Sequence, residues 1–405
     1  MLKGVIKIKV LMFGWEFPPL NQGGLGTACE GLVKSLITKG IEITLVLPQA
    51  QEIVLSALKV ISPNLKKIKI ASLLQAYQNS ESYDRAYKHH GNSKLYGENI
   101  FAEVSRYALA ARELIAGEEF DLIHAHDWLT FQAGIIAKEV SGKPLVVHVH
   151  ATEFDRSGGN GVNPLVYDIE REGMEKADGI ITVSNFTKNK VVEHYGVNPA
   201  KISVVHNGVS LSNYNLGGMI KHKKQEPLVL FLGRVTLQKG PDYFIATAKR
   251  VLEYNSEVTF VLAGSGDMTG RLIQQVAAWG IGDKVLFTGF LRGTDVDKMY
   301  QMADLYVMPS VSEPFGITPL EAMRNGVPVL ISKQSGVSEV INHCFKTDFW
   351  DIDETASDII SLLEHHELQQ ELSRNGQREA LKLSWDIPAE KCIAIYNNLS
   401  VGVVG

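Results

Sequence analysis

The stretch SVSEPFGITPLEAMRNG, residues 310–326, joins two carboxylates through a turn and the start of a predicted helix. The first carboxylate, Glu313, precedes Pro314, and a following proline disfavours α geometry, so Glu313 is expected in extended backbone. The second, Glu321, lies one turn into the predicted helix. A strand end, a turn and a helix start in this order are typical of βα units, in which ligands bind at the carboxyl end of the strand.

The helix start has the sequence of an N-terminal cap. Thr318 is expected at the N-cap position, with Pro319 at the first helical position and Glu321 three residues after the cap. Gly326 then ends the helix. Backbone N–H groups with partial positive charge gather at such a start and are expected to bind an anion between the two carboxylates. These N–H groups belong to Phe315, Gly316 and Ile317.

The same residues allow a purely structural interpretation. Thr318 and Glu321 form a capping box, in which the glutamate needs no other role, and Glu313 is then an exposed acid of a loop. Short motifs carry a high risk of false positives, so the choice depends on the surrounding chain. A sugar nucleotide has both features that the functional interpretation requires, a diphosphate and several hydroxyls.

Length and composition describe an ordinary globular protein with two domains. The 405 residues exceed what one hydrophobic core usually supports. Forty basic and forty-five acidic residues give a net charge of −5, which argues against a nucleic-acid-binding protein. The predicted domains are residues 1–215 and 226–385, with a polar linker, Ser210–Glu226, and a final helix near residues 386–400 that packs back onto the first domain.

Cysteine usage and the first residues favour a cytoplasmic protein. Cys29, Cys344 and Cys392 are far apart, odd in number and without metal-binding spacing, so free thiols in a reducing compartment are expected. The alternation of apolar residues and lysine over residues 5–10 predicts a strand rather than a signal peptide. No apolar run approaches the length that crosses a bilayer.

Predicted strands and helices alternate along both halves of the chain. Apolar runs such as LVVHV, residues 145–149, are flanked by predicted helices, which is typical of parallel strands buried on both faces. The predicted fold class is therefore α/β with parallel sheets, and ligands are expected at the carboxyl ends of the strands.

The first strand is expected to end at Phe13 and to enter a loop rich in proline and glycine, which contains Gly23 and Gly24. Thr27 and Glu30 form a predicted capping box for the helix that follows. A glycine loop between strand and helix lets the backbone approach a ligand closely, although it equally suits a tight turn that packs helix on sheet.

Four histidines occur in pairs on two predicted strands. His126, with Asp127, and His150 fall at strand ends, whereas His124 and His148 lie inside strands and are expected to be satisfied core residues. Each pair is spaced i, i+2 on a strand and not i, i+4 on a helix. No three-ligand metal spacing is present, so zinc is not expected.

The second half of the chain restarts the alternation with the predicted strand Leu228–Leu232 and the loop GRVTLQKG. Lys239 precedes a helix that Pro241 opens, and a cation at a helix N-terminus is disfavoured by about 0.3–1 kcal/mol unless an anion is recruited beside it. Arg234 in the same loop can bind phosphate oxygens with two parallel hydrogen bonds. The alternative is a solvated surface pair.

Together these landmarks resemble the retaining GT-B glycosyltransferases of family four, close to the glycogen/starch synthase group. The landmarks are the GGLG loop, HAHDW, the strand-end histidine, GRVTLQKG, and Glu313 with Glu321 at E-x7-E spacing. They cover nearly the whole chain in the order of the family. The resemblance implies two Rossmann-like domains whose parallel sheets face an interdomain cleft, with the nucleotide held mainly by the second domain.

The resemblance also implies roles for individual residues. Arg234 and Lys239 hold the diphosphate and stabilise the leaving group, Glu313 faces the donor hexose and its oxocarbenium-like charge, Glu321 binds the ribose hydroxyls, and His150 lies by the donor sugar. No metal or cofactor is implied, because the cations and the helix N-terminus supply the positive charge. The further donor-binding candidates are Gly23, Gly24, Phe290, Phe315, Gly316 and Ile317, and the acceptor candidates are His126, Asp127 and Trp128.

The implied reaction is transfer of a hexose, with glucose expected, from a UDP-, ADP- or GDP-sugar to a carbohydrate acceptor with retention of configuration. Two departures leave the acceptor open. Asn21 stands where bacterial glycogen synthases carry a lysine, and Glu321 is kept where they lack the second glutamate. Small-molecule, trehalose- or sucrose-type and lipid acceptors therefore remain alternatives to a glucan.

Other classes of protein share the implied fold. A GT-B-fold epimerase or phosphorylase is one alternative, although no position for the pyridoxal-phosphate lysine of a glucan phosphorylase is found. A non-catalytic glycan-binding protein is disfavoured, because Glu313, Arg234, Lys239 and His150 are all present. Peripheral membrane contact is an alternative to a solvated face for three lysines, Lys66, Lys67 and Lys69.

Overall fold

The computed structural model describes residues 8–19, 23–48, 53, 55–62, 100–159, 161–210 and 226–401. Several positions that the sequence singles out lie outside these ranges. They are Asn21, the lysines Lys66, Lys67 and Lys69, and residues 211–225 of the predicted linker.

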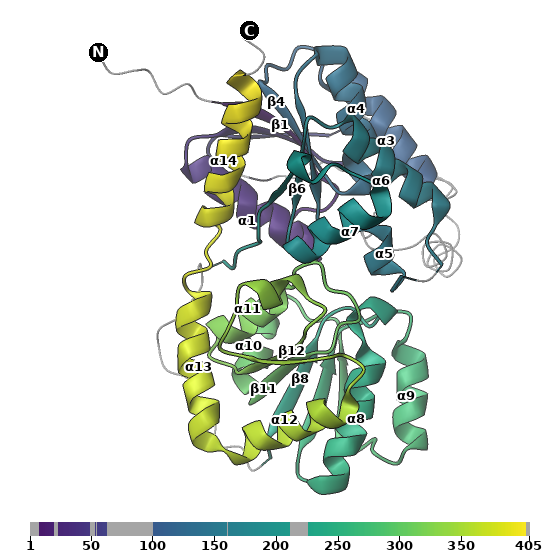
Figure 1. Cartoon of the computed structure of the whole chain (residues 1–405), viewed down its shortest axis with the longest axis vertical. Coiled ribbons are helices and arrows are strands. Elements are labelled where there is room, and N and C mark those ends of the chain that lie inside the picture. The colour runs from purple at the N-terminus through teal and green to yellow at the C-terminus, as the bar shows by residue number, and fades with distance from the viewer. Residues whose placement is uncertain are drawn as a thin grey trace. The chain divides into compact units, whose positions relative to one another are not determined.

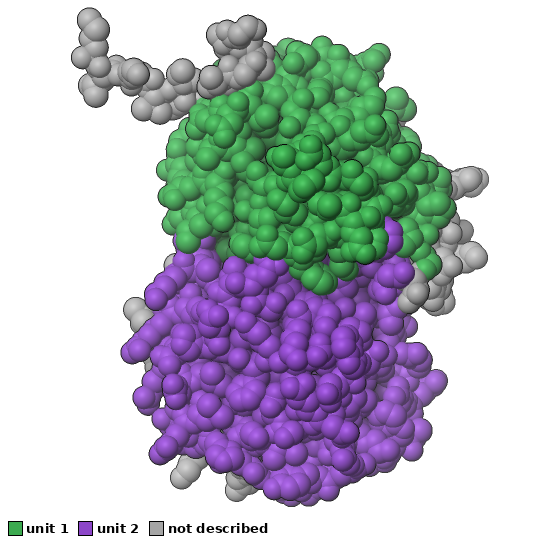
Figure 2. Space-filling model, viewed as in Figure 1, with its two compact units in different colours: residues 1–153, 161–208, 385–405 green, residues 154–160, 209–384 purple. Residues whose placement is uncertain are grey.

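The chain forms two compact units (Figure 2). Unit 1 comprises residues 1–153, 161–208 and 385–405, and unit 2 comprises residues 154–160 and 209–384. Each unit contains one sheet, and all the pairings between the described strands are parallel. The predicted α/β class with two Rossmann-like parallel sheets is therefore confirmed.

The sheet of unit 1 has the strand order β3-β2-β1-β4-β5-β6-β7. The order reverses between β1 and β4, so the loops that follow these two neighbouring strands open at one edge of the sheet, where ligands of such sheets bind. The bounds are β1 Lys9–Phe13, β2 Glu42–Val46, β3 Leu58–Ile61, β4 Leu122–His126, β5 Leu145–Val149, β6 Gly179–Thr182 and β7 Ile202–Val204.

Helices cover both faces of this sheet (Figure 1). Helix α4 packs so closely on one face that a Cβ on Gly134 would lie 2.9 Å from the side chain of Leu145 and 3.0 Å from that of Ala125. The helices among the described residues of unit 1 are α1 Gly24–Thr38, α3 Ile100–Leu114, α4 Trp128–Ser141, α6 Pro164–Lys176, α7 Asn185–Tyr195, the 3₁₀ turn Pro199–Lys201 and α14 Asp386–Val401, with α5, Glu153–Arg156, where the chain passes from one unit to the other.

The last helix, α14, lies beside α1 on the opposite face of the sheet (Figure 1). Alternate strand residues point to opposite faces, and His124, the neighbour of Ala125, contacts the Tyr396 hydroxyl of α14 through Nδ1 at 2.7 Å. At Gly31 of α1 a Cβ would lie 2.2 Å from the ring of Trp385, so the missing side chain makes room for that ring. Helices α1 and α14 therefore cover the histidine-bearing face together.

The sheet of unit 2 has the order β10-β9-β8-β11-β12-β13 and reverses between β8 and β11. Its strands are β8 Leu228–Leu232, β9 Thr259–Ala263, β10 Val285–Gly289, β11 Leu305–Met308, β12 Val329–Ser332 and β13 Phe345–Thr347. Its helices are α8 Pro241–Tyr254, α9 Thr269–Ala278, α10 Thr294–Met302, α11 Ile317–Arg324, α12 Ile352–Glu364 and α13 His366–Ala380, with 3₁₀ turns at Leu237–Lys239 and Gly336–Glu339.

Both predicted capping boxes are wrong. Helix α11 begins at Ile317, and its N-cap is Gly316, with φ 97° and ψ 93°, so Thr318 already lies inside the helix. Helix α1 likewise begins at Gly24 after Gly23. Gly316 has a positive φ that glycine adopts readily, and the chain enters α11 before Thr318. Gly23 has ordinary extended backbone, and the chain enters α1 before Thr27. Neither helix start has a side-chain cap, which leaves first-turn N–H groups for other partners.

Among the described residues, none of the helices combines the length and apolar character that a membrane span requires.

Candidate functional site

In unit 2, the loops after β8 and β11 bring Lys239 to Glu313. These strands are neighbours at the point where the strand order reverses, which is where open parallel sheets bind ligands. The ammonium of Lys239 forms an ion pair with the Glu313 carboxylate, and the Ser310 hydroxyl donates to the same carboxylate at 3.3 Å. Glu313 is only 5% exposed. Two donors therefore fix the direction of the carboxylate.

The backbone of Glu313 is fixed as well, by the loop that follows β12. Its N–H donates to the carbonyl of Gln334 at 2.9 Å, and its carbonyl accepts from the N–H of Gly336 at 2.8 Å. This parallel bridge is consistent with the extended backbone expected before Pro314. Three neighbouring strands, β8, β11 and β12, therefore position one carboxylate.

The loop that carries Arg234 and Lys239 is docked onto the end of β11. Arg234 donates from Nη2 to the side-chain oxygen of Gln238 at 3.1 Å, and the carbonyl of Gln238 accepts from the N–H of Val311 at 3.0 Å. Gly240 has φ 62°, and a Cβ there would lie 2.1 Å from the Pro309 carbonyl oxygen. A larger residue would push this loop, and with it Lys239, away from Glu313.

The second acid, Glu321, lies on α11 and interacts with a buried phenol. The Tyr300 hydroxyl is 3.1 Å from Oε2 of Glu321, to which it donates, and 3.2 Å from the carbonyl of Thr318. Tyr300 is fully buried, and burial raises the pKa of the Glu321 carboxyl above its usual value. The Thr318 hydroxyl, predicted as a cap, instead accepts from the Tyr306 hydroxyl at 2.8 Å.

The other donor-binding candidates of unit 2 lie around these acids. Phe315 is buried, Gly316 is the N-cap of α11, and Ile317 opens the helix. Phe290 follows β10, is 49% exposed and has the Arg292 guanidinium 5.4 Å from its ring centroid. A half-exposed aromatic ring beside a cation offers a flat surface for stacking. The roles predicted for these residues stay predictions.

In unit 1, four histidines form a stack of rings on the face that α1 and α14 cover. His126 pairs with His148 across β4 and β5, and ring centroids lie 4.1 Å apart for His148 and His150 and 4.3 Å apart for His124 and His126. Burial lowers the pKa of His126 to about 3. Burial also lowers the pKa of each of the other three histidines well below the usual value, and the neighbouring imidazoles lower these three further. All four rings are therefore neutral at pH 7.

The prediction of satisfied core histidines holds only in part. His124 and His148 are buried as expected, but Nε2 of His124 and both ring nitrogens of His148 have no hydrogen-bond partner among the described residues. Buried polar atoms without partners are uncommon. The stack thus contains more hydrogen-bonding capacity than the described part of the chain uses.

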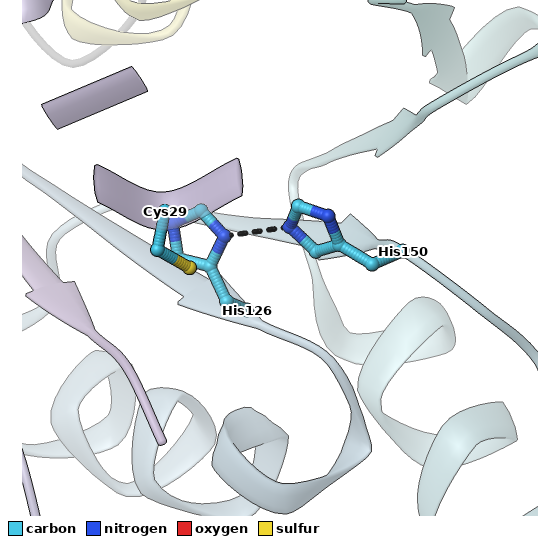
Figure 3. A group of neighbouring side chains, drawn as sticks. All are labelled: Cys29, His126 and His150. Atoms are coloured by element: carbon cyan, nitrogen blue, oxygen red, sulfur yellow. Dashed lines mark hydrogen bonds between the residues drawn. The ribbon is translucent and has the colours of Figure 1, made fainter. Parts of the chain in front are cut away.

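One end of the stack contains a cysteine that the sequence did not connect with it. Nδ1 of His126 and Nε2 of His150 are hydrogen-bonded at 2.9 Å, and in Figure 3 the sulfur of Cys29 lies next to the His126 ring. One ligand atom of each residue lies within 4.8 Å of the others. His124, His126 and His148 meet the same criterion. These two groups are the described residues of unit 1 that are placed to hold a metal ion.

The acceptor candidates are enclosed in unit 1. Asp127 has the unusual φ of 58°, and its Oδ1 accepts from the N–H groups of His150 at 2.6 Å and Ala151 at 3.3 Å, which ties the end of β4 to the end of β5. Trp128 is 1% exposed and packs on Phe101 with ring centroids 5.9 Å apart. These contacts are structural, and the acceptor roles of His126, Asp127 and Trp128 stay predictions.

The glycine loop after β1 also lies at the reversal of its sheet. Gly23 is the N-cap of α1, and a Cβ there would lie 2.5 Å from a carboxylate oxygen of Glu16. Gly24 has open space around it. Gly23 is therefore constrained by packing, whereas Gly24 leaves the backbone accessible, and the donor role of both stays a prediction.

Two family models together match most of the chain. "Glycosyltransferase Family 4" matches residues 22–213, and "Glycosyl transferases group 1" matches residues 219–379. A glycosyltransferase of Methanocaldococcus jannaschii without assigned function is 29% identical over 96% of this chain and 98% of its own length. The glycogen synthase of Mycobacterium tuberculosis is 26% identical over 82% of this chain and 80% of its own.

Solved structures have the same fold. Sucrose-phosphate synthase from Thermosynechococcus elongatus has a TM-score of 0.79 and 18% identity, over 98% of this chain and all of that one. An Anabaena protein in complex with UDP-glucose has a TM-score of 0.70 and 18% identity, over 97% and 100%. The catalytic domain of starch synthase IV from Arabidopsis thaliana, bound to ADP and acarbose, has a TM-score of 0.72 and 18% identity, over 98% and 100%.

Proposed function

The chain belongs to the GT-B glycosyltransferases of the family 4 type, and we propose that it transfers a hexose from a nucleoside diphosphate sugar to a carbohydrate acceptor. The expected hexose is glucose, and the configuration of the sugar is retained in the product as proposed. Similar structures carry UDP-glucose and ADP, which supports a donor of this class without fixing the base. The acceptor remains a glucan, a disaccharide-forming sugar, a small molecule or a lipid.

The observation that carries the proposal is the enclosed Glu313 carboxylate with Lys239 at the reversal of the sheet. When the bond between hexose and diphosphate breaks, positive charge develops on the sugar and negative charge on the leaving group. We assign the first charge to Glu313 and the second to Arg234, Lys239 and the uncapped start of α11. Preorganised charges of this kind stabilise a transition state without reorganisation.

The residues of unit 1 complete the proposal. His150 is assigned to the donor sugar, and Gly23 and Gly24 to the diphosphate. No metal takes part in the transfer as proposed, since Arg234 and Lys239 supply the positive charge. The three cysteines are free thiols, which supports the cytoplasmic location that we propose.

A donor panel tests this function. The purified chain is incubated with UDP-, ADP- and GDP-glucose and with the corresponding mannose and galactose donors, in the presence of a chelator and a mixture of acceptors. We expect one base to be preferred and the product to have the anomeric configuration of the donor by NMR. An inverted product would contradict retention, and loss of activity in chelator that Mg²⁺ restores would contradict the metal-free mechanism.

Replacing Tyr300 by phenylalanine tests how Glu321 is positioned. The variant removes the hydroxyl that donates to Glu321 and keeps the buried ring, so we expect the KM for the donor to rise about tenfold, since a hydrogen bond to a charged group contributes about 1.5–3 kcal/mol. The value of kcat should change by less than about twofold, because Glu321 is assigned to the ribose and not to the reacting carbon.

Tyr306→Phe is the matched control for this prediction. Tyr306 is equally buried, but its hydroxyl donates to the Thr318 hydroxyl and to the carbonyl of Leu232 instead of to Glu321. We expect its donor KM to stay near that of the parent protein. Equal KM changes in both variants would mean that the phenols only stabilise the fold of α11.

A further inference from the structure

The end of the histidine stack in unit 1 offers three donor atoms to a single point. Cys29 comes from α1, His126 from the end of β4 and His150 from the loop after β5, so elements distant in sequence converge there. Thiolate sulfur and neutral imidazole nitrogen are the ligands that Zn²⁺ prefers. We propose that Cys29, His126 and His150 bind a divalent cation of this preference, with Zn²⁺ as the expected occupant (Figure 3).

The distances suit a tetrahedral ion after a small adjustment. Nδ1 of His126 and Nε2 of His150 are 2.9 Å apart, and the ligand atoms of all three residues lie within 4.8 Å of one another. In a tetrahedral site with Zn–N of about 2.0–2.1 Å and Zn–S of about 2.3 Å, ligand atoms are about 3.3–3.6 Å apart. The hydrogen-bonded nitrogens therefore separate slightly, and the cation takes the place of the proton between them.

The charges around Cys29 favour a cation over a bare thiolate. Cys29 is fully buried, and the carboxylates of Asp127 and Glu16 interact electrostatically with its sulfur. The same two carboxylates lower the energy of a positive ion beside the sulfur. Without a cation Cys29 is a neutral thiol, so binding must supply the charge that stabilises the thiolate.

The proton balance of binding is simple. The cation displaces the thiol proton of Cys29, which leaves to solvent as the S–metal bond forms. The ring proton that occupies the hydrogen bond between His126 and His150 moves to the other nitrogen of its own ring, so both facing nitrogens present lone pairs. No oxidant or reductant takes part. Access is through His150, which at 5% is more exposed than His126 or Cys29.

Three protein ligands leave one position of a tetrahedral ion open. One of the three is a ring nitrogen of His150, which the bound cation therefore occupies. We assigned His150 to the donor sugar, so this consequence rests on the proposed function: the bound cation inhibits hexosyl transfer. The site is thus an inhibitory one for Zn²⁺, in a protein whose proposed chemistry needs no metal.

Cobalt spectroscopy tests the site directly. Co²⁺ is titrated into the chelator-treated full chain, where a tetrahedral thiolate site gives strong visible d–d bands and a near-ultraviolet sulfur-to-cobalt charge-transfer band. Competition with Zn²⁺ then gives the Zn²⁺ affinity. In Cys29→Ser we expect the charge-transfer band to vanish and the Zn²⁺ affinity to fall about 100-fold or more. Changes to residues outside the ligand shell already cost up to about 100-fold in metal affinity, and the loss of a ligand should cost at least as much.

Cys392→Ser is the matched control, because Cys392 is equally buried in the same unit and belongs to neither group of ligands. It should keep both the bands and the affinity, and near-ultraviolet circular dichroism should show that both variants are folded. An unchanged affinity in Cys29→Ser, or a parent protein without the charge-transfer band, overturns the proposal.

An activity assay adds the inhibitory consequence. Zn²⁺ should inhibit hexosyl transfer by the parent protein and by Cys392→Ser at concentrations that leave Cys29→Ser active. If the chain transfers no hexose at all, the proposed function fails while the cobalt bands still decide the metal site. If transfer proceeds and the bands are absent, only the metal site fails.

Discussion

Replacing Glu313 by alanine will lower the turnover of hexosyl transfer about 10³-fold, the upper range for removing one preorganised charge stabiliser, while nucleotide binding stays within a few-fold. The carboxylate is enclosed, ion-paired with Lys239 and hydrogen-bonded by Ser310, so no other described acid replaces it at that point. The nucleotide is assigned to Glu321, Arg234 and Lys239, which the substitution leaves in place.

The measurement separates the two effects. Single-turnover kinetics report the chemical step, and calorimetric titration with the nucleoside diphosphate reports binding. Glu313→Gln should be as slow as the alanine variant, because the amide keeps the volume and loses the charge. Glu379→Gln, at a partly buried acid that binds the Asn342 and His343 backbone in the same unit, is the control for general destabilisation. Turnover within tenfold of the parent in both Glu313 variants would reject the assigned role.

Much of the fold was predictable because strands buried on both faces are continuous apolar runs. The predicted strand at residues 228–232 has the bounds of β8. The short strands β3 and β13 were not predicted. Both lie at sheet edges, with partly exposed residues, and their pattern is too weak to distinguish from a loop.

The site was predictable where one short segment carries its chemistry. Glu313 and Glu321 are eight positions apart, and the loop of Lys239 follows a clear strand. The contact between Lys239 and Glu313 needed only the rule that strand ends meet at the reversal of a sheet. The phenol of Tyr300 on Glu321 was not predictable, because it depends on how α10 packs against α11.

The cysteine in the histidine stack illustrates the same limit. Cys29 is 97 positions before His126 and 121 before His150 (126 − 29 and 150 − 29), so metal-ligand spacing rules, which count neighbours along one element, do not detect the group. The capping boxes failed for a different reason. At α11 the positive φ of Gly316 lets the helix begin before Thr318. At α1 the helix begins after Gly23, whose backbone is ordinary extended, and a local sequence rule does not distinguish this start from one at Thr27.

Acid will unfold unit 1 before unit 2, and this is the largest stability effect we expect. The four stacked histidines are neutral in the folded unit because burial lowers their pKa values, to about 3 for His126, whereas an unfolded histidine has a pKa of about 6.5. Between these values the unfolded chain binds more protons, so stability is fully present above pH 6.5 and is lost as the pH falls toward 3.

Each histidine that must lose its proton to fold costs about 1.4 kcal/mol per pH unit in this window. Four of them exceed the stability of a typical domain, about 5–15 kcal/mol, within a few pH units. In unit 2 the described histidines, His343, His365 and His366, are exposed. Burial raises the pKa of Glu321, which gives stability that persists in acid and falls as the pH rises. We therefore expect unit 1 to lose its stability in acid before unit 2.

Hydrogen exchange between pH 7 and pH 4, corrected for the intrinsic rates, will measure this difference. Amides of β4 and β5 should lose protection at a higher pH than those of β8 and β11. In His148→Leu the loss of protection in β4 and β5 should occur at a lower pH than in the parent protein. The variant should behave like the parent at pH 7, because the His148 ring nitrogens have no hydrogen-bond partner among the described residues and their removal breaks no hydrogen bond there. His366→Asn, at an exposed position, should change nothing. Two results would contradict this prediction. Amides of β4 and β5 could stay protected at a lower pH than those of β8 and β11, or the amides of His148→Leu could lose protection at the same pH as those of the parent protein. In either case the buried imidazoles do not determine the acid stability of unit 1.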